Sequence, residues 1–153
     1  MSRQSKKNYP EFISDRINTL GSSLRATDYL RKVVLSKSGE KVGIVRDIVF
    51  HGHVFVGLLI GKNLFIDSKF VHSVADDAVM LSIEPVTLLR GKIVFDADGR
   101  QIGKVKDVVR RHTGNDYESI LVKKGIFRKP IAIPKSHVKT AGKNIILNTS
   151  YEL

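Results

Sequence analysis

The chain contains the same pattern twice, sixty residues apart. Residues 31–49 read RKVVLSKSGEKVGIVRDIV, and residues 91–109 read GKIVFDADGRQIGKVKDVV. Seven positions are identical between the two segments: Lys32/Lys92, Val34/Val94, Gly39/Gly99, Gly43/Gly103, Val45/Val105, Asp47/Asp107 and Val49/Val109. Self-similarity at a fixed period is the signature of a repeated structural module. The repeat therefore favours a paired binding scaffold over a single enzyme cleft.

From residue 31 onward both copies have the pattern of β-strands. Short apolar runs rich in Val, Ile and Phe are interrupted by turn residues. Residues 37–40 and 97–100 predict hairpin turns in which Gly39 and Gly99 have positive φ. The predicted strands cover 32–36, 42–50, 53–60, 63–67 and 78–83 in the first copy, and 92–96, 102–111, 117–123, 130–133 and 144–148 in the second. A short connection is expected before the last strand of each copy, over 68–74 and 135–141.

The length bounds the architecture. The chain has 153 residues, and a domain of about 60 residues buries only about 60% of the surface that it exposes when unfolded. Two such copies should pack together, or the protein should form a homodimer. The expected divisions are an N-terminal extension over 1–28, a first domain over 29–86 and a second over 87–153. In the extension, residues 1–9 are expected to form a basic arm, and 10–20 form either a short helix or a frayed tail.

The positive charge is concentrated in the second copy. The formal net charge is +11, of which residues 1–30 contribute +2, residues 31–86 contribute +1 and residues 87–153 contribute +8. A local excess of Lys and Arg attracts polyanions such as RNA, ribosomes or acidic proteins. The chain has no cysteine, and no apolar run of about 18 residues predicts a membrane span. The N-terminus lacks a secretory signal pattern, so a cytoplasmic protein is expected.

The ordered motifs of the second copy resemble those of the PRC-barrel family. They are Gly-Lys-Ile-Val at 91–94, Asp98-Gly99, Ile-Gly-Lys-Val at 102–105, Asp-Val-Val at 107–109, the apolar strand at 119–122, and Ile133-Pro134. The first copy matches at the same places, except that it has Arg31 and Asp67 where the second has Gly91 and Pro134. The resemblance implies an all-β protein of two tandem small PRC-type β-barrels.

The resemblance also implies a non-catalytic binding module. Similar domains occur in the C-terminal part of the ribosome maturation factor RimM, where the domain contacts a ribosomal protein. They also occur in archaeal cell-division proteins that bind the SepF anchor, and short basic tandem proteins of this kind look archaeal. The family therefore implies binding without choosing the partner.

The two copies differ on one face of their longest predicted strand. Strict alternation places Val45 and Val105 in the core and the neighbouring residues outside, although a bulge at a glycine would change the phase. The outward residues of the first copy include Ile44, Ile48 and Phe50, which are expected to pack on the second copy, on the N-terminal helix or on a partner. Those of the second copy are Ile102, Lys104, Lys106, Val108 and Arg110. Its three cations either meet a polyanion or belong to an ordinary solvated strand.

The loop from Lys123 to Pro130 is the second candidate binding element. Lys123, Lys124, Arg128 and Lys129 flank an apolar Ile126-Phe127 tip. Cations that meet phosphate and an aromatic ring that stacks on a base suit RNA, whereas in an ordinary hairpin both apolar residues would enter the core. Arg110, Arg111 and His112 are expected nearby. If six of these cations met phosphates of a duplex, the logarithm of affinity would fall with the logarithm of salt with a slope of about −5.

Other polar residues are given structural roles. Asp47 and Asp107 are expected to accept hydrogen bonds from backbone amides of the adjacent turn. His51, His53 and His72 are too few for a typical metal site, and no cofactor or catalytic motif is expected.

The sequence therefore predicts a non-enzymatic adaptor whose basic second domain contacts RNA or a ribosomal particle. The alternative is a cell-division or cytoskeletal adaptor that binds a protein partner of the SepF type.

Overall fold

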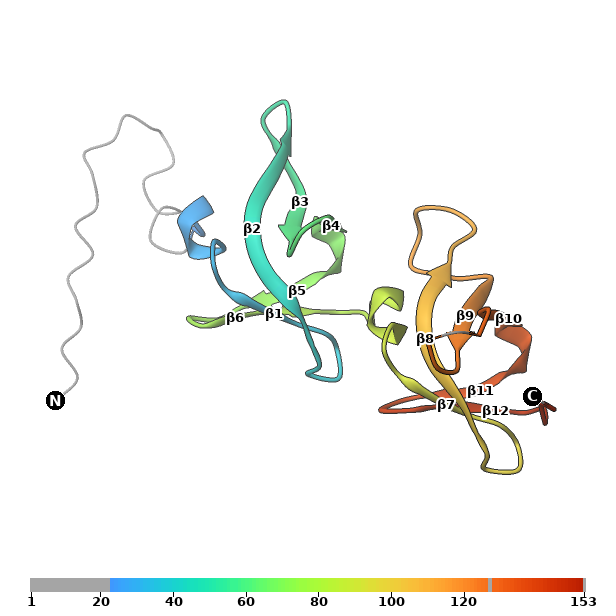
Figure 1. The fold of residues 1–153 in the computed structure, drawn as a ribbon. Helices are drawn as coiled ribbons and strands as arrows, with labels where there is room; N and C mark the ends of the chain where they lie inside the picture. The colour runs from blue at the N-terminus through green and yellow to red at the C-terminus, as the bar shows by residue number, and fades with distance from the viewer. Residues whose placement is uncertain (1–22, 127, 153) are drawn as a thin grey trace, which may run out of the picture.

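The protein is all-β in the part that the computed structural model describes, residues 23–126 and 128–152. Within these residues, twelve strands form two six-stranded sheets, and the helical segments are short 3-10 turns. The two sheets form two units that follow one another along the chain (Figure 1). The predicted fold class is therefore confirmed. The N-terminal arm and helix predicted over residues 1–20 lie outside the described residues.

The first unit begins at the 3-10 turn η2 (Ala26–Asp28). Its sheet has the order β4-β3-β2-β1-β6-β5, in which β1 and β6 are parallel and the other neighbours are antiparallel. The elements are β1 (Val33–Leu35), β2 (Lys41–His51), β3 (Val54–Ile60), β4 (Leu64–Asp67), the 3-10 turn η3 (Ser68–Phe70), β5 (Val71–Val74) and β6 (Ala78–Leu81).

The second unit repeats this arrangement. It begins at the 3-10 turn η4 (Val86–Leu89), and its sheet has the order β10-β9-β8-β7-β12-β11, with β7 and β12 parallel. The elements are β7 (Ile93–Phe95), β8 (Gln101–Val109), β9 (Ser119–Lys123), β10 (Ile131–Pro134), the 3-10 turn η5 (Lys135–His137), β11 (Val138–Ala141) and β12 (Ile145–Leu147). The same strand order in both units is the structural form of the sequence repeat.

All ten predicted strands are present, with ends that differ by a few residues. Both hairpin turns are confirmed, because Gly39 and Gly99 have φ of 88° and 80°. Sequence reasoning missed two strands, β5 and β11, which lie inside the predicted connections. Both follow a 3-10 turn, and their short, largely polar sequences VHSV and VKTA lack a strand pattern.

Strand β8 departs from strict alternation because it contains two bulges. Val105 pairs with Val122 and Asp107 pairs with Leu121, so that Lys106 is an extra residue. A second irregularity, against β7, leaves Ile102 without a direct partner there. An extra residue changes which face the following side chains occupy. The prediction that Ile102 and Val108 point outward is therefore wrong: both are buried.

The same bulge occurs in β2, where Val45 pairs with Ile60 and Asp47 with Leu59. At each bulge the aspartate accepts a hydrogen bond from the next backbone N–H, Ile48 or Val108, at 2.8 Å. The prediction that Asp47 and Asp107 serve the backbone is confirmed, but the amide belongs to the bulged strand and not to a turn.

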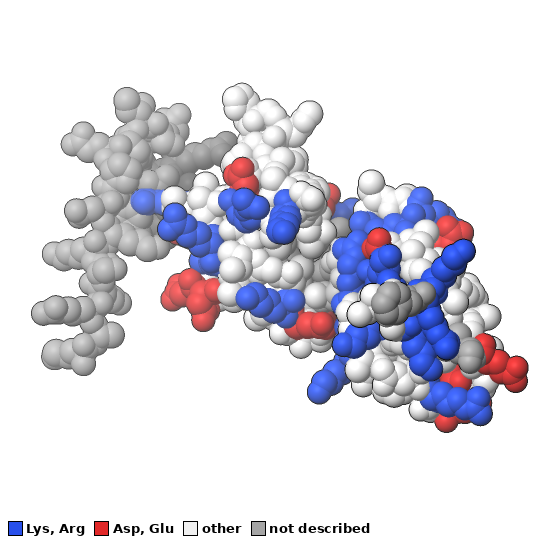
Figure 2. Space-filling model, viewed as in Figure 1, with Lys and Arg blue, Asp and Glu red and all other residues white. Residues whose placement is uncertain are grey.

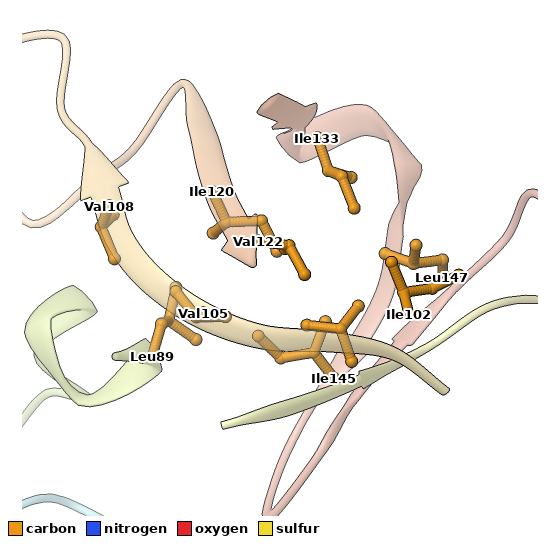
Figure 3. Close-up of a cluster of buried hydrophobic side chains, with 10 residues drawn as sticks. Leu89, Ile102, Val105, Val108, Ile120, Val122, Ile133, Ile145 and Leu147 are labelled. Atoms are coloured by element: carbon orange, nitrogen blue, oxygen red, sulfur yellow. The ribbon is translucent and has the colours of Figure 1, made fainter. Parts of the chain in front are cut away.

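Each unit has its own hydrophobic core. The first core consists of Val34, Val45, Leu58, Ile60, Ile66, Val79 and Leu81. The second consists of Leu89, Val94, Ile102, Val105, Val108, Ile120, Val122, Ile133, Ile145 and Leu147. Figure 3 shows the side chains of the second core directed from η4 and the surrounding strands into one interior. The outer strand faces and loops are thus left for contacts with partners.

Candidate polyanion-binding surface

The basic surface lies on β8, on the end of β9 and on the loop that follows β9. Figure 2 shows Lys and Arg gathered over this part of the second unit, whereas charges of both signs are spread over the first unit. We define the basic surface by the predicted cations that lie there: Lys104, Lys106, Lys123, Lys124, Arg128 and Lys129. Phe127, predicted to stack on a base, lies outside the described residues.

Lys104 and Lys123 occupy directly opposite positions on β8 and β9. Their neighbours Val105 and Val122 point into the core, so the two lysines point outward on the same face. Like charges directly opposite each other destabilise a strand pair. An anion bound between them would remove this repulsion.

The loop after β9 adds a pocket to the basic surface. Its volume is about 310 Å³, and it is lined by Ile102, Val122, Lys124, Arg128, Lys129 and Ile131. The apolar residues come from three neighbouring strands, and the cations come from the loop. We call this site the mouth pocket. Ile126, at the loop tip, is 82% exposed and does not enter the core.

The cations of the basic surface are not neutralised locally. Among the described residues, none of the six lies within ion-pair distance of a carboxylate. Two acids of the second unit pair with cations outside the basic surface: Arg90 Nε lies 2.9 Å from Asp107 Oδ1, and Lys135 pairs with Asp116. A hydrogen bond from the Val108 N–H, and then the Arg90 side chain, hold the pKa of the Asp107 carboxyl below its usual range.

Arg110 and Arg111 lie away from the mouth pocket, contrary to expectation. They follow the end of β8 where Val109 pairs with Ser119, while the loop at 124–130 adjoins the other end, where Lys104 pairs with Lys123. This strand length corresponds to about 15 Å. Arg110 Nη2 donates to the backbone oxygens of Thr113, at 2.7 Å, and Gly114. Arg110 is therefore engaged in its own loop, and Arg111 lies 3.9 Å from Glu118.

The junction between the units contains a residue that sequence reasoning missed. Asn115 Oδ1 accepts from the Val86 N–H at 2.9 Å, and its Nδ2 donates to the Glu84 carbonyl at 3.0 Å. Asn115 thus joins the loop after β8 to the connector between the sheets, residues 82–85, and to the start of η4. The loop between β8 and β9, residues 110–118, is longer than the loop between β2 and β3, residues 52–53, but nothing in its sequence indicates a contact with the connector.

A second pair of contacts lies at the same junction. Lys92 Nζ lies 3.3 Å from Glu40 Oε2 in the first unit and 2.6 Å from the Gly142 oxygen in the second. The Glu84 carboxylate accepts from the Ser38 N–H. These residues line a cavity of about 1050 Å³ between the units. Burial alone would raise the pKa of Glu84, but hydrogen bonds from the Ser36 and Ser38 side chains and the Ser38 backbone, with the charge of Lys92, hold it below its usual range.

Of the three predicted packing residues of the first unit, Ile48 packs against the core of its own unit, so its predicted outward position is wrong because of the bulge in β2. Ile44 and Phe50 are 42% and 54% exposed, so the second unit does not cover them. Phe50 contacts the Phe55 ring, with 6.2 Å between ring centroids. Together with Val54 and Phe65, which are also exposed, they give the first unit an apolar surface.

Other candidate sites can be checked within the described residues. No group of three or more His, Cys, Asp or Glu side chains there is placed to hold a metal ion, so His51, His53 and His72 do not form one. No helix in the described part is long and apolar enough to cross a membrane.

Comparison with known protein families finds a PRC-barrel domain at residues 82–153. The match includes the connector, η4 and all six strands of the second unit. No curated protein matches the chain. The second unit is thus a PRC-barrel domain, as its motifs indicated, and the first unit has the same strand order.

Proposed function

We propose that this protein is a non-enzymatic binding protein whose second unit contacts a polyanion through the basic surface. RNA or a ribosomal particle is the partner that we place first. The observation that carries the proposal is the gathering of six cations on β8, the end of β9 and the following loop, none of them in an ion pair with another described residue, including two lysines opposite each other on paired strands. An RNA-binding or ribosome-binding role implies a cytoplasmic protein, and this location is part of the proposal.

We further propose that the first unit is a diverged copy of the same domain. Equivalent contacts support this reading. Lys32 Nζ donates to the Ala75 oxygen at 2.5 Å, just as Lys92 Nζ donates to the Gly142 oxygen. Each lysine therefore donates a hydrogen bond to the turn before the last strand of its unit, at Ala75 before β6 or at Gly142 before β12. The similarity to RimM stays an expectation from the sequence motifs.

The test is the salt dependence of RNA binding. If the six cations met phosphates of single-stranded RNA, the logarithm of the affinity would fall with the logarithm of salt with a slope of about −4, because each contact contributes about 0.7. The double variant Lys104→Glu/Lys106→Glu should bind more weakly and flatten the slope by about 1.4 or more. Fluorescence anisotropy with a labelled oligonucleotide at several salt concentrations measures both quantities.

The matched control is Lys37→Glu/Lys41→Glu, which makes the same change of charge at two exposed positions of the first unit. It should leave the slope close to that of the wild type. A wild-type slope near zero, or equal effects of the two double variants, would contradict binding through the basic surface.

The second candidate function is an adaptor that binds a protein partner, such as a cell-division protein of the SepF type. The exposed Phe50, whose ring centroid lies 6.2 Å from that of the half-buried Phe55, and the exposed Val54 beside this pair favour this function, because exposed apolar patches often mark protein-binding sites. Recovery of ribosomal components from a lysate with and without ribonuclease separates the two functions. RNA-dependent recovery supports the first function, and ribonuclease-resistant recovery of one stoichiometric non-ribosomal protein supports the second.

A further inference from the structure

The mouth pocket combines an apolar floor with a cationic rim. Ile102 and Val122 are 2% and 1% exposed, so the floor is the edge of the hydrophobic core. Val122 pairs directly with Ile131 across β9 and β10, which completes the floor. A binding group that fits this pocket has an apolar part that covers the floor and an anionic part that meets the rim.

The first unit has an opening at the position equivalent to the mouth pocket, and we call each opening the mouth of its unit. In the first unit, another part of the same chain faces this mouth. Strand registers make Val42, Ile60 and Leu64 the equivalents of Ile102, Val122 and Ile131. These three residues line a cleft of about 550 Å³, whose opposite wall includes Thr87 and Leu88 of η4. In the first unit, a short protein segment with an aliphatic side chain, Leu88, therefore faces the mouth across this cleft.

The cations are placed differently at the two mouths. At the first mouth the rim is the short turn Gly61-Lys62-Asn63, with one cation, and two further cations line the cleft: Arg90, directly after η4, and Arg110, directly after β8. At the second mouth the rim itself holds the cations, and among the described residues no acid lines the pocket. A segment that lies across the second mouth must therefore carry acids where η4 is followed by arginine.

We propose that the mouth pocket docks a short segment of a partner protein, in which a leucine-sized aliphatic side chain lies beside Asp or Glu. The first unit supplies the geometric precedent, and the cationic rim sets the charge. This inference goes beyond the proposed function and does not require that the polyanion on β8 be RNA. A partner with acidic and apolar residues in one segment would contact both the pocket and the neighbouring cations of the basic surface.

The test uses the whole protein and a synthetic peptide. The probe is an acetylated octapeptide of sequence Asp-Asp-Val-Thr-Leu-Leu-Asp-Asp, which copies η4 and adds acidic flanks. Titration followed by amide NMR shifts should give changes that cluster at residue 102 and residues 122–131. Replacing both leucines of the peptide by serine keeps its charge and should weaken binding roughly tenfold or more, because the apolar contact is lost.

Two variants test the two parts of the pocket separately. Ile131→Trp should fill the floor and weaken peptide binding about tenfold or more. Lys124→Glu/Arg128→Glu should do the same through the rim, and it keeps the test decisive if the tryptophan variant fails to fold. Lys139→Glu, on β11 and outside the pocket lining, is the control and should bind as the wild type does.

Three results would overturn the inference. One is an absence of shifts at the mouth, and another is equal binding of the leucine and serine peptides. The third is tighter binding of an eight-nucleotide oligouridylate than of the peptide, with the same loss in Ile131→Trp, which would make the pocket a nucleobase site. Failure of RNA binding in the salt experiment would leave these measurements unaffected, so the two proposals fail separately.

Discussion

Equivalent hairpin turns in the two units satisfy the same backbone amides with different residues. In the second unit, Asp96 Oδ1 accepts from the N–H groups of Asp98 and Arg100 at 2.9 Å each. In the first unit, Ser36 occupies the equivalent position and accepts from the Glu40 N–H at 3.1 Å. The missing carboxylate comes instead from Glu84 of the connector. In the first unit, a carboxylate distant in sequence, Glu84, thus accepts the hydrogen bond that Asp96 accepts within its own turn in the second unit. This bond connects the first turn to the connector.

Asp96 gives a prediction about acid sensitivity. Its burial alone would raise the carboxyl pKa, but backbone N–H groups of Arg100, Tyr151 and Asp98 hold the pKa below its usual range. A carboxylate with a lowered pKa stabilises the fold at pH values above its unfolded pKa, about 3.9, and loses that effect as the pH falls through the folded pKa. The melting temperatures of wild type and Asp96→Asn should therefore differ most at pH 5–7 and converge below about pH 4.

The control for this comparison is Asp76→Asn, which changes an exposed acid in a turn of the first unit. The melting temperature of Asp76→Asn should differ little from that of the wild type at every pH. A difference for Asp96→Asn that stays constant from pH 7 to pH 3 would show that the carboxylate charge is not what stabilises the turn.

Arg31 is a residue in a conformation that favours glycine. Its φ is 66°, and Gly91 at the equivalent position has φ of 81°. Both N–H groups make the same bond, to the carbonyl of Val45 or Val105 at 2.9 or 2.8 Å. A left-handed conformation costs a residue with a side chain about 1–2 kcal/mol. Glycine avoids this cost, but its greater conformational freedom in the unfolded chain reduces the stability of the fold by about 0.5–1 kcal/mol.

We therefore expect Arg31→Gly to raise the free energy of unfolding by up to about 1 kcal/mol. The reverse change, Gly91→Arg, should lower it by about 1 kcal/mol. Urea unfolding followed by circular dichroism measures both. Destabilisation by Arg31→Gly would mean that the arginine side chain contributes a contact stronger than the backbone strain.

At the level of the elements, the sequence predicted the strands that alternate apolar residues with clear turns. It missed β5 and β11 because a four-residue strand after a 3-10 turn carries too little pattern. It also missed the bulge at Lys106, since that depends on how β8 pairs with β9 and not on β8 alone. Register between strands is a tertiary property, which a single strand's composition does not contain.

The sequence predicted the cations of the candidate site but not its apolar floor. The cations of the loop after β9 were identified from their clustering, and they do lie on one surface with Lys104. The apolar floor of the mouth pocket was not foreseen, because strict alternation placed Ile102 outside. Nor did the sequence show that Arg110 bonds its own loop, since those acceptors are backbone oxygens.

Gly103, beside the first bulge of β8, lies where a side chain would collide with β9. A Cβ at this position would lie 2.5 Å from the Lys123 carbonyl oxygen, which belongs to the backbone of β9 and cannot easily move. Gly103→Ala should therefore push β8 and β9 apart and destabilise the second unit by about 1–3 kcal/mol. Gly142→Ala is the matched control, because a Cβ there meets nothing within 4 Å. Equal melting temperatures for the two variants would contradict this reading.

At the scale of the whole molecule, the two units are held together through the connector rather than by a shared core. Each core is composed of residues from its own unit. Among the described residues, the side-chain hydrogen bonds and ion pairs at the junction are few: Lys92 with Glu40, Glu84 with Ser38, and Asn115 with the connector and the buried start of η4. Such contacts fix an orientation without contributing much to the stability of either unit.

Asn115 is the contact whose loss should have the largest effect on orientation. Asn115→Ala removes the acceptor of the Val86 N–H, and leaving a buried donor without a partner costs about 1–3 kcal/mol. The loop after β8 should then release the connector, so that the amide reaches water and the two units tumble more independently. NMR relaxation should show one rotational correlation time for both units in the wild type and two shorter ones in the variant.

The comparison with Asn115→Asp separates the two hydrogen bonds. Aspartate keeps an acceptor for the Val86 N–H but cannot donate to the Glu84 carbonyl, so an intermediate loosening is expected. Asp76→Ala, at an exposed bend of the first unit outside the junction cavities, should leave the tumbling unchanged. If all three variants tumble as the wild type does, the orientation is set by Lys92 and Glu40 across the other side of the junction. Lys92→Ala should then change the tumbling more than Asn115→Ala does, because the Lys92 side chain contacts both Glu40 of the first unit and the turn at Gly142 of the second.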